Sequence, residues 1–181
     1  MVKYRRKNPL ARPLRFSLKI LAGWEKKLDY KKLMAKERFK IIPSVYLVLI
    51  KDNKILLSRR YNTGYFDGNY SLPAGHLEGN ETFIQGLVRE VKEEIGVVLA
   101  PVDLKLVHTM NRMIPDNERA DFFFTAEKWQ GEPKIMEPEK CDDLRWFDLD
   151  NLPKNIVPYI RQAINSILNN IIYSEREGNE K

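Results

Sequence analysis

Three glutamates lie close together in the stretch GHLEGNETFIQGLVREVKEEIGV, which covers residues 75–97. At about 100° of rotation per helical residue, Glu90, Glu93 and Glu94 fall on one face of a helix. Like charges three or four residues apart destabilise a helix by roughly 0.2–0.5 kcal/mol per pair without a cation. Converging carboxylates suit hard octahedral cations such as Mg²⁺ or Mn²⁺, which also bind phosphates. The pattern therefore indicates metal-assisted attack of water on phosphorus.

A solvated polar face is the simpler alternative for these glutamates, because glutamate-rich faces are common on amphipathic helices. Two observations favour a metal site. The helix follows a glycine-containing loop that offers backbone carbonyls, and the rest of the sequence contains no competing catalytic cluster. The helix pattern alone leaves both interpretations open.

The helix that carries the glutamates is expected at about residues 81–95. Asn80 suits the N-cap, and Glu81 suits the first turn, where the helix dipole favours an anion. Gly96 suits the left-handed position that ends a helix. The apolar face has spacings of three and four residues and consists of Ile84, Leu87, Val88, Val91 and Ile95.

The other predicted elements indicate an α/β sandwich with a mixed β-sheet. Two apolar runs at 44–50 and 54–60 read as strands, and the turn pair Asp52-Asn53 joins them as a hairpin. The polar residues 174–181 are expected to form a frayed tail. Further strands are expected at 103–110, 120–129 and 144–149, and an amphipathic helix at 156–172.

Composition excludes several classes of protein. The chain has 181 residues, which is long enough to bury a core without disulfides or a structural metal. A single cysteine, Cys141, excludes an intrachain disulfide, and two histidines argue against a zinc site built from His and Cys clusters. No apolar run approaches the roughly 18–20 residues of a membrane span. A reducing compartment, and hence a cytoplasmic location, is expected.

The net charge of +6 is unevenly distributed. Residues 1–40 hold 14 Lys and Arg against 3 Asp and Glu, whereas the remaining chain holds 17 against 22. We therefore expect a basic N-terminal extension at 1–40, one domain at 41–173 and the polar tail. Residues 1–33 include a short basic amphipathic pattern, for which a solvated extension and weak contact with nucleic acid or a membrane surface are the alternatives.

The stretch at 75–97 resembles the Nudix box, G-x5-E-x7-R-E-U-x-E-E-x-G-U, where U is aliphatic. The resemblance covers roughly residues 41–172 and implies an α/β/α sandwich with a mixed sheet between helices. It also implies a hydrolase that cleaves a nucleoside diphosphate linked to another group, X. Every defined position of the box is filled, by Gly75, Glu81, Arg89, Glu90, Val91, Glu93, Glu94, Gly96 and Val97.

The resemblance also assigns roles to individual residues. Glu90 and Glu94 would be the principal ligands of Mg²⁺ or Mn²⁺, and Glu93 would be a ligand or the catalytic base. The backbone carbonyl of Ala74 would complete the metal shell. Arg89 would orient the glutamates and, four residues before Glu93, is placed to pair with it. Glu81 would be structural or a supporting partner.

Some members of the family take the general base from a loop beyond the box. The acidic stretch EPEKCDDLRW, at 137–146, lies in the corresponding region. Glu139 or Glu137 is the candidate base there, and an ordinary acidic loop is the alternative.

Substrate contacts are expected near the loop after the second strand. Arg59 and Arg60 end that strand and suit phosphate oxygens, although a surface salt bridge is the alternative for one of them. Tyr61 and Phe66, like Tyr70, suit stacking on a base. The side chains for which a structural role is favoured are Phe122 and Phe124 of the FFF run, His76, His108 and Cys141.

The stretches NTGYFDGNYSLPAGH and EPEKCDDLRWF resemble small MutT-like members of the family. This resemblance points to a free or modified NTP or dNTP, cleaved to a monophosphate and pyrophosphate by a nucleotide pyrophosphohydrolase that acts on acid anhydrides. An RNA decapping-type hydrolase that uses the basic arm and a non-catalytic nucleotide sensor are the alternatives. Family members often dimerise, so a homodimer is a further implication.

Overall fold

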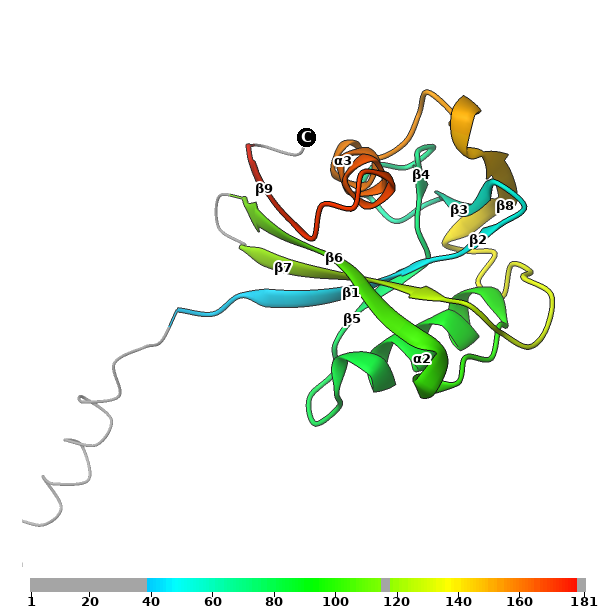
Figure 1. Cartoon of the computed structure of the whole chain (residues 1–181), viewed down its shortest axis with the longest axis horizontal. Coiled ribbons are helices and arrows are strands. Elements are labelled where there is room, and N and C mark those ends of the chain that lie inside the picture. Colours follow the sequence, from blue (N-terminus) through cyan, green and yellow to red (C-terminus); the bar gives the residue numbers. More distant parts are fainter. Residues whose placement is uncertain (1–38, 115–117, 179–181) are drawn as a thin grey trace, which may run out of the picture. The chain divides into compact units, whose positions relative to one another are not determined.

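The computed structural model describes residues 39–114 and 118–178 (Figure 1). Contacts within the chain separate Met1–Phe39 from Lys40–Lys181. The predicted basic arm, its amphipathic pattern and its predicted contacts with nucleic acid or membranes lie outside the described residues. The domain that carries the glutamates is therefore considered by itself.

The first strands form the predicted hairpin. Strand β1 covers Ile42–Val48, β2 covers Ile50–Lys51 and β3 covers Lys54–Arg60. Between β2 and β3, Asp52 and Asn53 have φ angles of 51° and 58°. Two left-handed residues in a two-residue turn match the twist of paired strands, and Asp and Asn tolerate this conformation.

The strands make a five-stranded mixed sheet and a smaller antiparallel sheet. The larger sheet has the order β5-β1-β7-β6-β9, in which the β1–β7 and β6–β9 pairs are parallel. In the smaller sheet β3 pairs with β2, β4 and β8. The three predicted strands after the helix are all present, with ends shifted by as many as three residues. The remaining strands are β4 (Tyr70–Ser71), β5 (Ala74–His76), β6 (Leu104–Met113), β7 (Arg119–Ala126), β8 (Cys141–Asp148) and β9 (Tyr173–Glu177).

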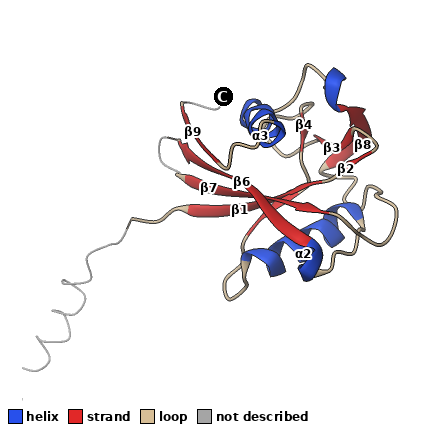
Figure 2. Ribbon diagram, viewed as in Figure 1, coloured by secondary structure: helices blue, strands red, loops and turns tan. Residues whose placement is uncertain are grey.

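Two α-helices cover opposite faces of the larger sheet (Figures 1 and 2). Helix α2 covers Phe83–Ile95, and α3 covers Pro158–Leu168. Short 3₁₀ turns, η2 at Pro101–Asp103 and η3 at Leu149–Asn151, precede β6 and α3. Nowhere in the described part of the chain is there a helix long and apolar enough to cross a membrane.

Alternate residues of the central strands supply two separate cores. In β1, Val45 and Leu47 pack in the cluster that contains the apolar face of α2, whereas Tyr46 packs in the cluster that contains α3. In β7, Phe123 is fully buried on the α3 side and Phe124 is 7% exposed on the α2 side. The expected α/β/α sandwich with a mixed sheet between helices is therefore confirmed.

The start of α2 differs from the expected one. Thr82, not Asn80, is the N-cap, and its hydroxyl accepts the Gln85 N–H at 3.2 Å. The Gln85 side chain in turn accepts the Thr82 N–H at 2.8 Å, which completes a capping box. Asn80 instead lies in the loop with a φ of 71°, and Glu81 lies before the helix. This reciprocal pair satisfies two backbone donors, which a cap at Asn80 would not.

The C-terminal end also differs from the expected frayed tail. Helix α3 ends at Leu168, and residues 173–177 form β9 beside β6. The hydroxyl of Ser174 lies 2.9 Å from Nε2 of the buried His108, which ties the strand to the sheet. A polar edge strand lacks an apolar pattern, so its sequence resembles that of a tail.

Candidate active site

Helix α2 holds Glu90 and Glu94 beside its buried apolar face, where they approach strand β5. Gly96 ends the helix with a φ of 70°, and its N–H donates to the carbonyl of Lys92. Glu90 and Glu94, one turn apart, line a cavity beside the helix. The buried residues that fix this orientation are Leu87, Val91 and Ile95.

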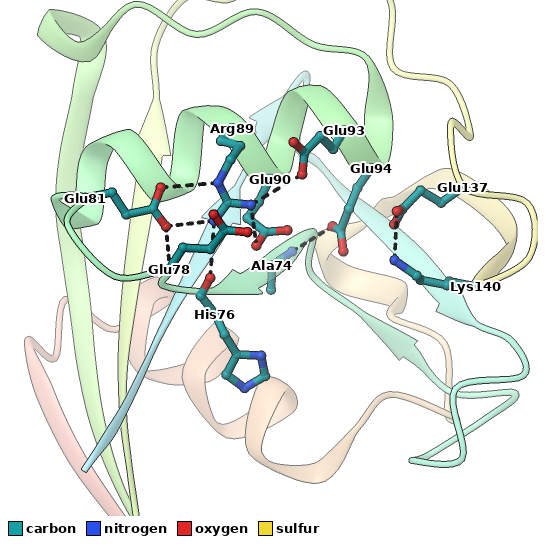
Figure 3. A network of polar contacts seen from close by, with 10 residues as sticks. All are labelled: Ala74, His76, Glu78, Glu81, Arg89, Glu90, Glu93, Glu94, Glu137 and Lys140. Atoms are coloured by element: carbon teal, nitrogen blue, oxygen red, sulfur yellow. Dashed lines mark hydrogen bonds and ion pairs between the residues drawn. The ribbon is translucent and has the colours of Figure 1, made fainter. Parts of the chain in front are cut away.

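Arg89 is the centre of a polar network on this helix (Figure 3). Its guanidinium donates to both carboxylate oxygens of Glu81, at 2.7 and 3.2 Å. It also donates to Glu90 at 2.9 Å, to Glu93 at 3.3 Å and to the carbonyl of His76 at 3.3 Å. One cation thus faces three carboxylates, so the network carries excess negative charge and holds each carboxylate in place.

Glu94 lies on the cavity wall, and its carboxylate accepts the Ala74 N–H at 2.9 Å (Figure 3). Burial raises the pKa of Glu94 to about 8, and repulsion from Glu90 and Glu137 acts in the same direction. Burial also raises the pKa of Glu90. A positive charge added near Glu90 and Glu94 would therefore stabilise the ionised form of both carboxylates.

Gly75 makes room for Glu90 against strand β5. A Cβ atom at position 75 would lie 1.9 Å from the carboxyl carbon of Glu90 and 2.2 Å from one of its oxygens. Any other residue would displace Glu90 or the strand. The glycine is thus required by close approach and not by an unusual backbone angle.

The carboxylates face a cavity of about 580 Å³ that is lined from β1, β3, β5, α2 and the loop before β8. Its lining brings together charges of both signs, so it suits a ligand that carries phosphates and binds a cation. The acidic lining residues include Glu90, Glu94 and Glu137, and the basic ones are Arg59, Arg60, Arg119 and Lys140.

The loop before β8 places Glu137, not Glu139, at the cavity. The backbone N–H groups of Lys140 and Cys141 both donate to the Glu137 carbonyl at 3.0 Å, so the loop folds back on itself. Glu137 lines the cavity and pairs with Lys140 at 2.7 Å, whereas Glu139 is exposed outside the lining. Of the two candidate bases, geometry favours Glu137.

The two predicted arginines both line the cavity, but both are already bonded. Arg59 donates to both oxygens of Asp142, at 2.7 and 3.0 Å, which is the salt bridge considered as an alternative. Arg60 donates to the carbonyl of Tyr65 at 2.6 Å and to the hydroxyl of Thr63 at 3.0 Å. Among the described residues, no carboxylate pairs with Arg60, so its charge is not neutralised by one of them.

The predicted aromatic contacts lie elsewhere. Tyr61 is 49% exposed, and Phe66 packs against the α3-side core, so neither lines the cavity. Tyr65 lines it instead. Gly64 and Phe66 have φ angles of 75° and 50°, which break the strand-like alternation on which a sequence-based assignment relies. Tyr70 is buried and donates a hydrogen bond to Asp143.

Several lining residues were missed by sequence reasoning. Ser44, Tyr46 and Tyr159 lie on the α3 side of the cavity, and Arg119 begins β7. Alternation along the first predicted strand could have placed Ser44 and Tyr46 on one face. No sequence signal brings Tyr159 or Arg119 there, because only the tertiary fold joins α3 and β7 to β1.

The imidazole ring of His76 contacts Arg119 and not the glutamates of α2. Its ring points away from the α2 carboxylates (Figure 3), and its Nε2 lies 2.8 Å from Nη1 of Arg119. Because a guanidinium only donates, Nε2 is the unprotonated acceptor of a neutral imidazole. Burial, followed by the charge of Arg119, lowers the pKa of His76 and keeps the ring neutral.

Neither His108 nor Cys141 provides a nucleophile at the cavity. Nδ1 of His108 lies 2.8 Å from the carbonyl of Ile171, and the ring is buried, which fits its expected structural role. Cys141, for which a structural role is expected, is only partly buried and lines the cavity. Burial raises the pKa of its thiol, which disfavours a thiolate.

The donor chemistry of the carboxylates fits a hard divalent cation. Glu90 and Glu94 offer oxygen ligands at the cavity wall, beside the backbone of Ala74. In the conformation described, Glu90 is engaged by Arg89, and no three acidic, histidine or cysteine side chains among residues 39–114 and 118–178 converge as a preformed metal cluster. The fit therefore rests on the type, burial and excess charge of the donors.

The chain is similar to hydrolases that are named for different substrates. It is 35% identical over 133 residues to an ADP-ribose pyrophosphatase from Methanocaldococcus jannaschii, covering 72% of this chain and 77% of the relative. It is 29% identical over 119 residues to the 8-oxo-dGTP diphosphatase of Escherichia coli, covering 65% and 91%. An NAD-capped RNA hydrolase, NudC, from Stutzerimonas stutzeri is 32% identical over 114 residues; the match covers 63% of this chain but only 39% of that protein.

Solved structures share the fold. A MutT NUDIX hydrolase from Burkholderia pseudomallei has a TM-score of 0.65 at 25% identity, with 70% of this chain and 98% of that chain covered. A bifunctional NMN adenylyltransferase/ADP ribose pyrophosphatase from Francisella tularensis, complexed with AMP and a Mn ion, has a TM-score of 0.55 at 21% identity, with 84% and 48% covered.

The sequence profile of the NUDIX domain matches residues 40–166, which include strands β1 to β8, helix α2 with its glutamates and most of α3. The match, the relatives and the fold agree with the box at 75–97. The chain therefore belongs to the NUDIX domain family and is a Nudix hydrolase.

Proposed function

We propose that this chain hydrolyses a phosphoanhydride bond in a nucleoside diphosphate linked to another group, X, with Mg²⁺ or Mn²⁺ as the cation. The family comprises hydrolases that act on small nucleotide substrates and generally use a divalent metal. The main observation behind this proposal is that one cavity is lined by Glu90 and Glu94 and also by Arg60 and Lys140. Carboxylates that can bind a cation and positively charged side chains that can bind phosphate oxygens thus line the same cavity.

Glu90 and Glu94 would hold the cation, with Glu93 and the carbonyl of Ala74 as further donors. A divalent cation at this position supplies charge neutralisation at phosphoryl oxygens and lowers the pKa of a bound water. Arg89 orients the carboxylates through the hydrogen bonds already described. The cation would also favour the ionised form of Glu94, whose pKa is raised by burial and, to a smaller extent, by repulsion from Glu90 and Glu137.

A carboxylate would accept the proton of the attacking water. The candidates are Glu93, which the family resemblance names but which does not line the cavity, and Glu137, which lines it and pairs with Lys140 at 2.7 Å. The new bond joins the water oxygen to phosphorus, and the anhydride P–O bond breaks. Arg60 is placed to neutralise charge on the phosphoryl oxygens, because its guanidinium lines the same cavity.

The proposed substrate class includes the substrates for which the relatives are named. ADP-ribose, an NAD cap and 8-oxo-dGTP, the groups named for the relatives above, each contain a nucleoside phosphoanhydride. The MutT-like stretches favour a free or modified NTP or dNTP, and the pyrophosphatase from Methanocaldococcus jannaschii favours ADP-ribose. Both belong in the first assay.

The assay measures hydrolysis of a panel of NTPs, dNTPs, 8-oxo-dGTP, ADP-ribose and capped RNA, with and without Mg²⁺. Glu94→Gln keeps the size of the side chain and the acceptor for Ala74, and should lower kcat at least about 100-fold. Glu127→Gln is the matched control, because Glu127 is exposed and pairs with Lys105 outside the cavity. Unchanged turnover in Glu94→Gln would contradict the assignment.

RNA decapping is a second candidate, favoured by the similarity to NAD-capped RNA hydrolases and by the excess of Lys and Arg in residues 1–40. Phosphate contacts make RNA binding fall steeply with salt. Binding of NAD-capped RNA should therefore show a steep salt dependence that disappears when residues 1–33 are removed. Equal salt dependence with and without them would remove this candidate.

A further inference from the structure

Two buried polar atoms of the cavity have no hydrogen-bond partner among the described residues. They are Oγ of Ser44 and Nε of Arg119. Ser44 is 2% exposed, so its hydroxyl is withdrawn from solvent. A buried polar atom without a partner destabilises the folded state, and natural proteins contain few of them. Two in one cavity indicate a ligand that supplies acceptor atoms.

The positions of both atoms follow from the sheet. Ser44 lies opposite His76 in the β1–β5 pair, and Asp121 of β7 lies opposite Ser44 on its other side. Arg119 begins β7 and donates one guanidinium nitrogen, Nη1, to the His76 ring at 2.8 Å. His76 thus holds the guanidinium beside Ser44 without neutralising its charge, because the imidazole is neutral.

Arg59 and Arg112 have their charge balanced by a carboxylate, whereas Arg60 and Arg119 form no ion pair among the described residues. Arg59 pairs with Asp142, and Arg112, which donates to the lining residue Tyr46, pairs with Asp121. Arg119 forms no ion pair with any residue in the described ranges. A neutral acceptor would complete its hydrogen bonds but would leave the charge uncompensated. An anionic oxygen group satisfies both needs, since a guanidinium binds phosphate through parallel N–H donors.

This end of the cavity is separate from the α2 carboxylates. Glu94 contacts the backbone of Ala74, whereas Ser44 and Arg119 lie at His76, two residues further along β5. Two residues of a strand span roughly 7 Å. A ligand held at both places must therefore extend about that far beyond the bond that is cleaved.

We propose that Arg119 and Ser44 bind a phosphate group of the substrate that lies beyond the cleaved anhydride. The proposal rests on the proposed function and deepens it, because it ranks substrates. A γ-phosphate of a nucleoside triphosphate and a phosphate monoester on a ribose are the two sources of this chemistry. ADP-ribose has neither and would leave both side chains unsatisfied.

The test compares substrate pairs that differ by one phosphate in the wild type, Arg119→Gln and Ser44→Ala. One arm uses the four nucleoside triphosphates against their diphosphates, and the other uses ADP-ribose 2′-phosphate against ADP-ribose. In whichever arm contains the true substrate type, Arg119→Gln should lower kcat/KM for the phosphate-bearing member roughly 10- to 100-fold, mainly through KM. Ser44→Ala should lower the same kcat/KM roughly 3- to 10-fold. The other member of the pair should change less than about threefold.

A control variant and a binding measurement separate the two levels of the proposal. Lys105→Gln removes one exposed positive charge outside the cavity and should leave every ratio unchanged. Calorimetric titration with inorganic phosphate, without divalent metal, should show binding to the wild type and to Lys105→Gln but not to Arg119→Gln.

Equal phosphate binding by all three proteins, or equal losses for both members of each pair, would overturn the subsite. An inactive wild type whose phosphate binding still depends on Arg119 would instead contradict only the proposed hydrolysis. The two failures are therefore distinguishable.

Discussion

Two arginine–carboxylate systems in this molecule differ in charge balance and in access to solvent. Arg112 and Asp121 pair between β6 and β7 with side chains 1% and 0% exposed. Arg112 also lies 3.7 Å above the ring of Tyr159. Arg89 instead pairs with Glu81, Glu90 and Glu93, of which Glu90 lines the cavity, and 25% of its side chain is exposed.

The comparison shows how charge balance separates a structural pair from a binding site. The Arg112 pair is balanced and closed, so it needs nothing from solution. The α2 network has more carboxylates than cations and lies at a cavity, so it has a reason to bind a cation. The same residue types therefore serve different roles because of their number and their access.

Breaking the closed pair should give the largest loss of stability. Arg112→Met leaves Asp121 as a buried carboxylate without its charge partner, so unfolding free energy should fall by about 3–5 kcal/mol in denaturant titrations. Replacing both residues, as Arg112→Met with Asp121→Leu, should recover most of that loss. A double variant as unstable as the single one would show that the pair is not simply a balanced charge pair.

Altering the open network at Gly75 should reduce activity more than stability. Gly75→Ala places a methyl group 1.9 Å from the carboxyl carbon of Glu90, so Glu90 must move. We expect kcat/KM to fall roughly 100-fold, about 2.7 kcal/mol, while the thermal midpoint changes little. Gly79→Ala is the control, because nothing lies within 4 Å of a Cβ there. Equal activities of the two variants would contradict this role for Gly75.

The raised pKa of Glu94 predicts a pH dependence of stability without metal. Between its ordinary value of 4.5 and about 8, the folded state keeps a proton that the unfolded state has released. Stability therefore falls as pH rises through this window. In chelator, Glu94→Gln should be more stable than the wild type by about 1–3 kcal/mol at pH 8 and equal to it at pH 4. Denaturant titrations at both pH values check this, and identical curves at pH 8 would exclude it.

The smallest effect is expected at the helix start, which belongs to the scaffold. Thr82→Ala removes the capping hydroxyl that accepts from Gln85, and should destabilise by about 1 kcal/mol. Activity per folded molecule should stay the same, which distinguishes this change from those in the network. A thermal melt and a saturated kcat measure the two quantities.

Sequence reasoning located the helix with its carboxylates because local rules govern both. The spacing of Val91 and Ile95 defines the buried face, and Gly96 defines the end. It missed the cap at Thr82 because Asn80 is as good a cap by residue type. It also missed β9, because a polar edge strand has no apolar period and depends on β6 for its hydrogen bonds.

The cavity beyond the helix depends on tertiary contacts, so sequence could predict only part of it. Arg60 was placed correctly at the end of a strand, whereas the backbone angle of Phe66 turned that ring away. Glu137 lines the cavity and Glu139 does not, because the loop turns back through hydrogen bonds to the Glu137 carbonyl. The residue types alone do not show which of the two glutamates this turn directs to the cavity. Arg119 lies 43 residues from His76 in the chain and meets it only in the folded sheet.

The most direct test of the central claim is a titration with Mn²⁺, followed by the loss of its free electron paramagnetic resonance signal. The wild type should bind the ion, and Glu94→Gln should weaken binding roughly 10- to 100-fold or more, while Glu127→Gln should bind as the wild type does. Equal Mn²⁺ binding by the wild type and Glu94→Gln would contradict the claim that the excess carboxylates of α2 hold the cation.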